Sequence, residues 1–288
     1  MDATAPHLND EDQPAEQQRS AQLRRQLRWA AGAVSLTLRE PADGLDRVRV
    51  RAREFVRGKA PAPSYTIDSD WHQSLHEQLG QSWPCPLARE FEQLWARVLE
   101  DARSHGVSLG RSTYGGWDDG DRAFAQAIWC LVHALRPRKV VETGVARGVT
   151  SRVILEALDR LGAGHLWSID LPAMDSALHD SIGIAVPDSL RKRWTYVSGT
   201  SRRRLPGLLS EVGPIDLFVH DSSHTERNML FELQRAWPAI ERGAIVADDV
   251  QQSPAFARFT ASIEAAKAAY VAPAEDGRAL FGIALKDG

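Results

Sequence analysis

The sequence predicts an α/β protein with an open, mostly parallel sheet covered by helices. Beyond residue 120, short apolar runs alternate with amphipathic helical segments, which is the rhythm of parallel strands joined by crossover helices. One of these runs, 140–143, ends in an acidic residue and a glycine-containing turn that opens a helix. The last two apolar runs flank Glu275-Asp276-Gly277, a turn that predicts an antiparallel hairpin.

We expect six or seven strands in this sheet. The five parallel candidates are 139–143, 165–171, 194–199, 215–221 and 244–248, and the terminal hairpin spans 270–285. Helices fill the gaps between them, as in 225–237, where Met229, Leu230, Leu233 and Trp237 share one face.

The N-terminal part predicts a different organisation. Residues 1–18 carry five acidic residues and no Lys or Arg, and are too polar to offset the entropy of ordering, so we expect a disordered acidic tail. For residues 19–112 we expect a helical cap that contacts the substrate. Its helices are expected over 16–40, around 45–56, and twice between 71 and 105, on either side of Trp83-Pro84-Cys85-Pro86. Residues 113–288 then form the sheet domain.

Composition narrows the classes of function. A chain of 288 residues, 43% hydrophobic, buries enough surface for a globular enzyme, and a net charge of −3 argues against a nucleic-acid partner. No run of 18 apolar residues and no secretory signal occur, so we expect neither a membrane span nor export. Cys85 and Cys130 lie far apart, with no Cys or His at metal-ligand spacing, which argues against a disulfide framework or a zinc site and favours a cytoplasmic location.

The turn after the first parallel strand predicts a particular cofactor. Gly144 and Gly148 are four residues apart, which is wider than the glycine spacing that seats a pyrophosphate on a helix. Glu142 would repel a phosphate but suits a ligand with an ammonium group. Asp170, 28 residues later at the end of the next strand, is placed to accept hydrogen bonds from ribose hydroxyls. The two acids favour S-adenosylmethionine over a nicotinamide cofactor.

The segment from Glu142 to Gly148, followed by Ser168-Ile169-Asp170, resembles class I S-adenosylmethionine-dependent methyltransferases over about residues 113–285. The resemblance implies a Rossmann-like sheet of seven strands ending in an antiparallel hairpin, with the methionine part of the cofactor at the loop, the ribose at Asp170 and the adenine near residues 199–201. The expected cofactor-binding residues are Glu142, Thr143, Gly144, Ala146, Gly148, Thr150, Ser151, Asp170, Gly199, Thr200, Ser201 and Asp221.

Acidic residues also end the next two strands. Asp221 follows the run 215–220, and Asp248 and Asp249 follow the run 244–247. Neighbouring strands lie about 4.8 Å apart, so these carboxylates can converge on a hard cation such as Mg²⁺. The stretch Asp221-Ser222-Ser223-His224, with an acid pair beginning 27 residues after Asp221, is similar to metal-dependent macrolide-sugar (macrocin-type) O-methyltransferases. That resemblance implies that Asp221, Asp248 and Asp249 bind the metal and that Asp221 and His224 are catalytic, with His224 as the base.

The function expected from these features is methyl transfer from S-adenosylmethionine to a hydroxyl of a small molecule, such as a sugar or a glycosylated natural product. One alternative is metal-independent methylation of oxygen or nitrogen, with Asp248 and Asp249 binding an amine or shaping the rim. The aspartates would then serve as turn formers or caps, a role that also suits Thr225 before the following helix. A second alternative is a noncatalytic cofactor-binding module whose basic segment 19–59 binds a partner protein. The apolar cap helices also make a homo-oligomer possible.

Overall fold

The computed structural model describes residues 63–114, 117–171, 176–263 and 266–287, and six single helical positions between Gly32 and Leu45. The expected acidic tail, and most of the helices expected over 16–40 and 45–56, therefore lie outside the described residues. In chain order, the helices and strands are α3 (Trp71–Gln78), α4 (Ala88–Ser104), β1 (Gly110–Tyr114), β2 (Trp117–Asp119), α5 (Arg122–Leu135), β3 (Lys139–Thr143), α6 (Val149–Arg160), β4 (His165–Asp170), η2 (Ser176–Ser181), η3 (Asp188–Arg193), β5 (Trp194–Ser198), α7 (Ser201–Val212), β6 (Ile215–His220), α8 (Glu226–Ala236), η4 (Trp237–Ala239), β7 (Ile240–Ala247), η5 (Val250–Gln252), α9 (Ala255–Ser262), β8 (Ala266–Pro273) and β9 (Leu280–Lys286).

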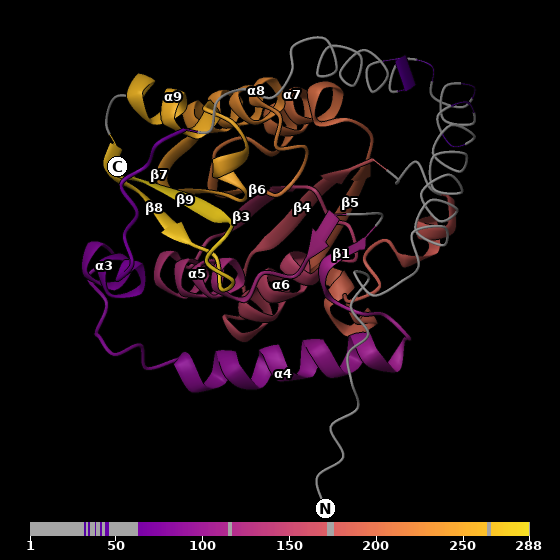
Figure 1. Ribbon diagram of the computed structural model, residues 1–288, viewed down its shortest axis with the longest axis horizontal. Coiled ribbons are helices and arrows are strands. Elements are labelled where there is room, and N and C mark those ends of the chain that lie inside the picture. The colour runs from indigo at the N-terminus through magenta and orange to yellow at the C-terminus, as the bar shows by residue number, and fades with distance from the viewer. Residues whose placement is uncertain are drawn as a thin grey trace, which may run out of the picture.

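The central sheet has seven strands in the order β5-β4-β3-β6-β7-β9-β8 (Figure 1). The five strands from β3 to β7 pair in parallel, and β9 pairs antiparallel with both β7 and β8. This confirms the Rossmann-like methyltransferase sheet and its terminal hairpin. The chain turns to one side of β3 for β4 and β5, and to the other side for β6 and β7. The carboxyl ends of β3 and β6 therefore flank a topological switch point, where open α/β sheets bind their ligands.

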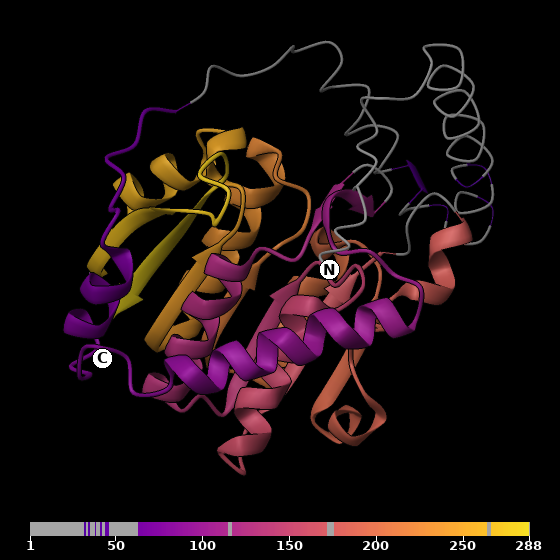
Figure 2. The ribbon, with the colours of Figure 1, turned by 60° about the horizontal axis from the view of Figure 1, so that its bottom comes forward.

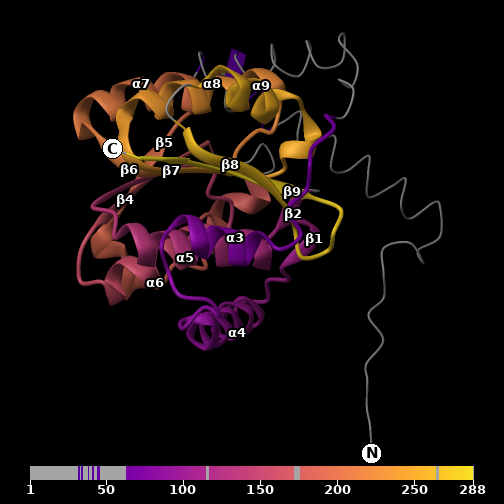
Figure 3. The same ribbon diagram turned by 90° about the vertical axis from the view of Figure 1, so that its left-hand side faces the viewer.

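Helices cover both faces of the sheet. Figure 3 shows α7, α8 and α9 on one face and α5 and α6 on the other. Successive β3 residues point to opposite faces: Val140 packs into the cluster with α5 and α6, and Val141 packs into the cluster with α7 and α8. Since both faces are covered, the parallel strands have nearly continuous apolar sequences.

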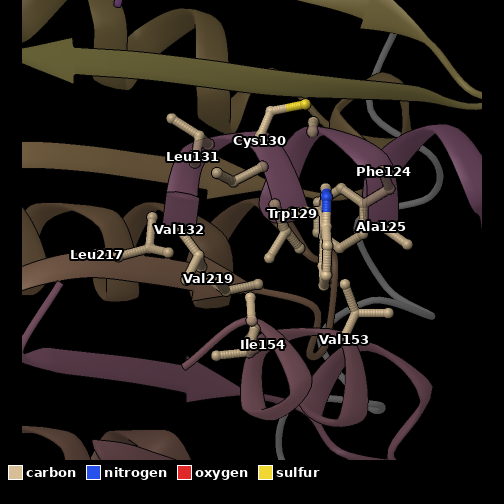
Figure 4. Close-up of a cluster of buried hydrophobic side chains, with 14 of the residues drawn as sticks. Phe124, Ala125, Trp129, Cys130, Leu131, Val132, Val153, Ile154, Leu217 and Val219 are labelled. Carbon is tan, nitrogen blue, oxygen red and sulfur yellow. The ribbon is translucent and has the colours of Figure 1, made fainter. Parts of the chain in front are cut away.

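The core on the α5 face is built from side chains of two helices and the central strands. Phe124 and Trp129 of α5 lie with Val153 and Ile154 of α6 and with Leu217 of β6 (Figure 4). Nearly every residue of α5 from Ala123 to Val132 is buried, because further helices cover its outer side. Its first turn is fixed by Asp121, whose carboxylate accepts a hydrogen bond from Phe124 N at 2.6 Å.

The two helices expected between residues 71 and 105 are confirmed as α3 and α4. The expected apolar face of α4 is buried at Phe91, Leu94, Trp95 and Val98. Figure 2 shows α4 crossing the outer side of the α5 and α6 layer. Trp71 of α3 meets Phe281 of β9 edge-on at 5.2 Å between ring centroids. These contacts place α3 against the terminal hairpin and α4 against the helical layer.

Two features differ from the sequence-based expectation. Strand β7 begins at Ile240, four residues before the predicted start at residue 244. The prediction missed these residues because Glu241 and Arg242 are charged and exposed and interrupt the apolar pattern of the strand. A short antiparallel hairpin, β1 with β2, precedes α5 and was not expected. In the part of the chain that the structure describes, no helix has both the length and the apolar character needed to cross a membrane.

Candidate active site

The loop between β3 and α6 forms the centre of the candidate site. Gly144 has φ of +88° and Gly148 has φ of +83°, a backbone region that glycine adopts readily. A Cβ on Gly144 would lie 1.9 Å from the carbonyl oxygen of Asp221, so the loop after β3 packs directly on the backbone after β6. Gly148 ends the loop and immediately precedes α6, whose first backbone amides are available at the site.

Glu142 is fully buried near the end of β3. Its Oε2 accepts hydrogen bonds from Ser151 Oγ and Ser168 Oγ, both at 2.6 Å, while its Oε1 is buried without a hydrogen-bond partner. Burial raises the pKa of this carboxyl to about 7, against the two serine hydrogen bonds, which lower it. A positively charged ligand group at the loop would supply the compensation that Glu142 lacks.

Asp170 at the end of β4 lies against the same loop. Its Oδ2 accepts hydrogen bonds from the amides of Val145 and Ala146, each at 3.0 Å, and its Oδ1 accepts from Leu171 N at 2.7 Å. The hydrogen bonds to the loop fix the direction in which its carboxylate points.

The remaining expected cofactor residues divide into two groups. Gly199 follows β5, where its amide donates to Asp170 O at 2.9 Å, and Thr200 caps α7. This keeps the 199–201 turn beside Asp170. Thr143 and Ser201 instead use their hydroxyls within the protein: Thr143 Oγ1 donates to Glu232 at 2.6 Å, and Ser201 Oγ lies 3.4 Å from Asn228 Oδ1.

Three side chains meet at the carboxyl ends of β6 and β7. Asp221, His224 and Asp248 each offer a ligand atom, and these atoms lie within 4.8 Å of one another. The close approach follows from the register, because His220 of β6 pairs with Ala247 of β7, directly before the two aspartates. Thr150 Oγ1 of α6 donates to Asp221 Oδ2 at 3.2 Å, which joins this acidic rim to the cofactor loop.

The acidic rim is short of positive charge. Burial raises the pKa of Asp221 well above its usual value, and the carboxylates of Asp248 and Glu142 raise it further. The pKa of Asp248 is also raised well above its usual value, by burial and then by Asp249 and Asp121. Within the described residues, neither Asp221 nor Asp248 forms an ion pair with Lys or Arg. Oxygen ligands in this state suit a divalent cation, so the donor set fits Mg²⁺.

His224 is almost fully buried beside these aspartates. Its Nε2 lies 3.6 Å from Asp249 Oδ2, and its Nδ1 is buried without a hydrogen-bond partner. Burial and the neighbouring His220 lower the pKa of His224 to about 3, so the neutral imidazole is the form present near pH 7. A neutral imidazole can accept a proton or bind a metal.

Asp249 is oriented differently from the other two predicted metal ligands. Its backbone is left-handed, with φ of +52°. Its carboxylate accepts hydrogen bonds from the side-chain amides of Gln251, at 2.7 Å, and of Gln252, at 2.5 Å. The structure therefore places Asp221, Asp248 and His224 together, with Asp249 next to His224.

A buried network beneath the rim has no counterpart in the sequence analysis. Glu232 of α8 is fully buried and accepts hydrogen bonds from Thr143 Oγ1, Ser222 Oγ and Asn228 Nδ2, and it pairs with His220 Nδ1 at 2.6 Å. Burial alone would raise the pKa of Glu232, but His220 and the hydrogen bonds outweigh burial and lower it. The His220 ring lies edge-on to that of His224, 5.5 Å away, so the network supports the candidate base from below. A glutamate on an amphipathic helix is normally exposed, and the sequence carries no other signal for this role.

The β1–β2 hairpin is attached to the cofactor loop by Arg147. This buried guanidinium donates to Asp119 Oδ2 at 3.0 Å and to the carbonyls of Ser108, at 3.0 Å, and Thr113, at 2.7 Å. It also lies over the Tyr114 ring, 5.4 Å from the centroid. Burial and the carboxylates of Asp170 and Asp119 raise the pKa of Tyr114.

Comparisons with known proteins agree with the fold. Residues 141–250 match the model of a family described as a methyltransferase domain. A candidate O-methyltransferase from Klebsiella pneumoniae shares the fold with a TM-score of 0.52 at 18% identity, over 76% of this chain and 97% of that chain. TomG from Streptomyces achromogenes, an O-methyltransferase involved in tomaymycin synthesis and solved with S-adenosylmethionine, gives 0.50 at 15% identity, over 67% and 89%. The cofactor-bound structure of Rv0187 from MTB gives 0.50 at 16%, over 78% and 100%. No curated protein sequence matches the chain.

Proposed function

We propose that this enzyme, whose residues 141–250 form a methyltransferase domain, transfers a methyl group from S-adenosylmethionine to a hydroxyl oxygen of a small molecule. The observation that carries the proposal is the convergence of Asp221, His224 and Asp248 beside the glycine loop after β3. In this proposal, His224 would be a proton acceptor and the aspartates a cation site next to the expected methyl donor. A sugar or a glycosylated natural product is the acceptor class that best fits the resemblance at the rim.

The cofactor part of the proposal rests on two acids. Glu142 would compensate the ammonium group of the methionine part, because its carboxylate is buried and one of its oxygens lacks a partner. Asp170 would accept hydrogen bonds from the ribose, held in place by the loop amides of Val145 and Ala146. Gly144, Ala146 and Gly148 have positive φ and shape the loop that would hold the methionine part, and residues 199–201 would lie on the adenine side.

In the reaction, the acceptor oxygen forms a bond to the methyl carbon while the carbon–sulfur bond breaks. The electron pair of the broken bond neutralises the sulfonium and leaves S-adenosylhomocysteine. His224 takes the hydroxyl proton, and Asp249, 3.6 Å from its Nε2, would stabilise the imidazolium. Much of the rate enhancement would come from holding oxygen, carbon and sulfur in line.

The same proposal assigns Asp221, Asp248 and Asp249 as ligands of a divalent cation. A bound Mg²⁺ would supply positive charge that stabilises the acceptor alkoxide. The fit rests on the buried, unpaired carboxylates of Asp221 and Asp248. Because Gln251 and Gln252 hold the Asp249 carboxylate, His224 is the competing candidate for the third ligand.

Cofactor binding is the first test. Calorimetry of the full chain with S-adenosylmethionine should show binding that Glu142→Ala and Asp170→Ala weaken, while circular dichroism shows both variants folded. The methyltransferase proposal fails if the wild-type chain binds no cofactor under conditions in which it is folded.

The base and the metal ligands are separated by kinetics with a sugar-hydroxyl acceptor. We expect His224→Ala to lower kcat by about 10²- to 10⁴-fold with little change in cofactor affinity. Asp248→Asn should abolish the activation by Mg²⁺ that follows chelation. If Asp249 binds the metal, Asp249→Asn raises the Mg²⁺ concentration needed; if it supports His224, the variant shifts the pH profile of kcat instead. Full activity in excess chelator would remove the metal from the proposal.

One alternative retains specific support. The uncompensated carboxylates of the rim would also bind a cationic amine, which favours metal-independent N-methylation. An acceptor screen that includes amines, read by the mass of the methylated product in the presence of chelator, distinguishes this case. The basic segment 19–59, on which the interaction-module alternative depends, lies almost entirely outside the described residues.

A further inference from the structure

A second group of potential metal ligands lies between α3 and α5. His72 and His76 come from α3, Cys85 from the connection to α4, and Cys130 from α5. Each offers one ligand atom, and these atoms all lie within 4.8 Å of one another. The group shares no residue with the acidic rim and consists of two thiols and two imidazoles, which is a donor set that soft and borderline metals prefer.

The two histidines are arranged as metal-binding histidines usually are. A separation of four residues puts both imidazoles on one face of α3. His76 Nδ1 lies 2.9 Å from the carbonyl oxygen of Ser82, to which it can donate a hydrogen bond. This leaves Nε2, which is buried and has no hydrogen-bond partner, while the residue as a whole is only 4% exposed. Metal-binding histidines typically donate their other ring N–H to a carbonyl or carboxylate in this way.

The cysteines complete the group. Both are free thiols; Cys130 is buried and Cys85 is partly buried. Cys130 Sγ lies 3.5 Å from His72 Nε2. Figure 4 shows Cys130 projecting from α5 on the side away from Val153 and Ile154. The Trp83 ring packs edge-on against both imidazoles, with centroid distances of 4.7 Å to His72 and 5.4 Å to His76, and so screens them from water.

We propose that His72, His76, Cys85 and Cys130 bind one Zn²⁺ ion in a tetrahedral, structural site. With zinc–ligand bonds of about 2.0 to 2.3 Å, ligand atoms in such a site lie about 3.3 to 3.8 Å apart. The pair His72 and Cys130 already has this separation, and the more distant pairs need to close by about 1 Å. Two thiolates neutralise the charge of Zn²⁺, so the filled site is compatible with burial.

The site would fasten the segment before α4 to the sheet domain. Helix α3 has only eight residues, and the connection from Gln81 to Pro84 is exposed. A zinc ion would join α3, this connection and α5 at one point, and structural zinc contributes directly to folding. The sequence alone does not indicate the site, because its spacing is H-x₃-H-x₈-C-x₄₄-C and the last ligand comes from a separate helix.

The first experiment is to measure zinc in the full chain, purified under reducing conditions without a metal-affinity step. Mass spectrometry of the elements should find one tightly bound zinc per chain. Replacement by Co²⁺ should give the visible bands of tetrahedral cobalt and the near-ultraviolet absorption of a thiolate bound to cobalt. This readout needs neither a variant nor enzyme activity.

Variants then locate the ion. Cys85→Ser and His76→Ala should each lower zinc affinity by at least tenfold and remove the thermal stabilisation that zinc gives the wild-type chain. Asp248→Asn is the matched control: it changes the acidic rim and should leave zinc content and the cobalt spectrum unaltered. Failure of the zinc site is thereby distinguishable from failure of the rim proposal.

Four outcomes would overturn the proposal. The reduced wild-type chain could retain no zinc after dialysis against added Zn²⁺, or cobalt could bind without a thiolate band. Intact-mass measurement of the chain purified under reducing conditions could instead show that a Cys85–Cys130 disulfide is its stable form. If Asp248→Asn lost its zinc while Cys85→Ser kept it, the zinc would have to be assigned to the acidic rim.

Discussion

Gly144 shows how one backbone position ties the cofactor loop to the acidic rim. Its φ of +88° is a region that disfavours other residues, and a Cβ there would overlap the Asp221 carbonyl at 1.9 Å. Gly162 is a matched control, because its φ is +68° but a Cβ would meet nothing within 4 Å. We expect Gly162→Ala to destabilise the chain by about 1 to 2 kcal/mol, which is the left-handed backbone cost alone.

Gly144→Ala should destabilise the chain more than Gly162→Ala does, since it also forces the chain after β6 to move. We expect a loss of more than about 4 kcal/mol, or an unfolded product. Urea denaturation of both variants measures the difference. Equal stability losses would show that the contact between the loop and Asp221 is looser than the structure describes.

Among single residues, the sequence predicted those whose role depends on their position at the end of a strand. Glu142, Asp170 and Asp221 each follow an apolar run, and the parallel topology brings such ends to one edge. Their hydrogen-bond partners were not predictable. Glu232 lies beneath the rim because α8 is rotated to bury it, and that rotation depends on packing against α9 and the sheet.

The β1–β2 hairpin is the element that depends most on one side chain. Arg147 joins it to the cofactor loop through a buried ion pair with Asp119 and two carbonyl contacts. The hairpin was not predicted from the sequence because its strands are short and polar, as in Gly110-Arg111-Ser112-Thr113-Tyr114. The planar guanidinium of Arg147 is suited to several acceptors at once.

We expect Arg147→Met to destabilise the chain by about 3 to 5 kcal/mol, because it leaves Asp119 buried without a counter-charge. Hydrogen exchange over residues 110–119 should accelerate, and cofactor affinity should fall. The double variant Arg147→Met with Asp119→Leu should recover much of the stability but not the affinity. As a control, Arg103→Ala removes an exposed pair with Glu100 and should change stability by less than about 1 kcal/mol. An exchange rate unaffected by Arg147→Met would contradict the role given to this residue.

For the whole molecule, the alternation of apolar runs with amphipathic helical segments was sufficient to predict the sheet. It was insufficient to predict contacts between segments that are distant in the sequence. Each parallel strand is buried on both faces, so its apolar run stands out from the flanking helices. The placement of α4 outside α5 and α6 depends on the packing of Phe91, Leu94, Trp95 and Val98 and on ion pairs such as Arg152 with Asp101, which join parts of the sequence that carry no shared pattern. The group formed by α3 and Cys130 was missed for the same reason.

The buried carboxylates give the whole chain a distinctive pH dependence. Burial raises the pKa of Glu142 to about 7 and the pKa values of Asp221 and Asp248 well above their usual range. A carboxyl with a raised native pKa binds its proton more tightly in the folded than in the unfolded state. The contribution of these carboxyls to folding stability is therefore greatest at low pH, begins to fall above about pH 4, and stops falling once pH exceeds the native pKa.

We expect the free energy of unfolding, measured by urea denaturation at a fixed zinc content, to decrease between pH 5 and pH 8. Glu142 alone would account for about 3 kcal/mol of that decrease, and Glu142→Gln should remove this share. Mg²⁺ should restore more stability at pH 8 than at pH 5, because the raised pKa values of Asp221 and Asp248 favour their protonation as the pH falls, and Asp248→Asn should lose the Mg²⁺ effect. Stability that rises over this interval, or a Mg²⁺ effect equal at both pH values, would mean that these carboxylates are compensated within the protein, and the acidic rim would then have no need of a cation.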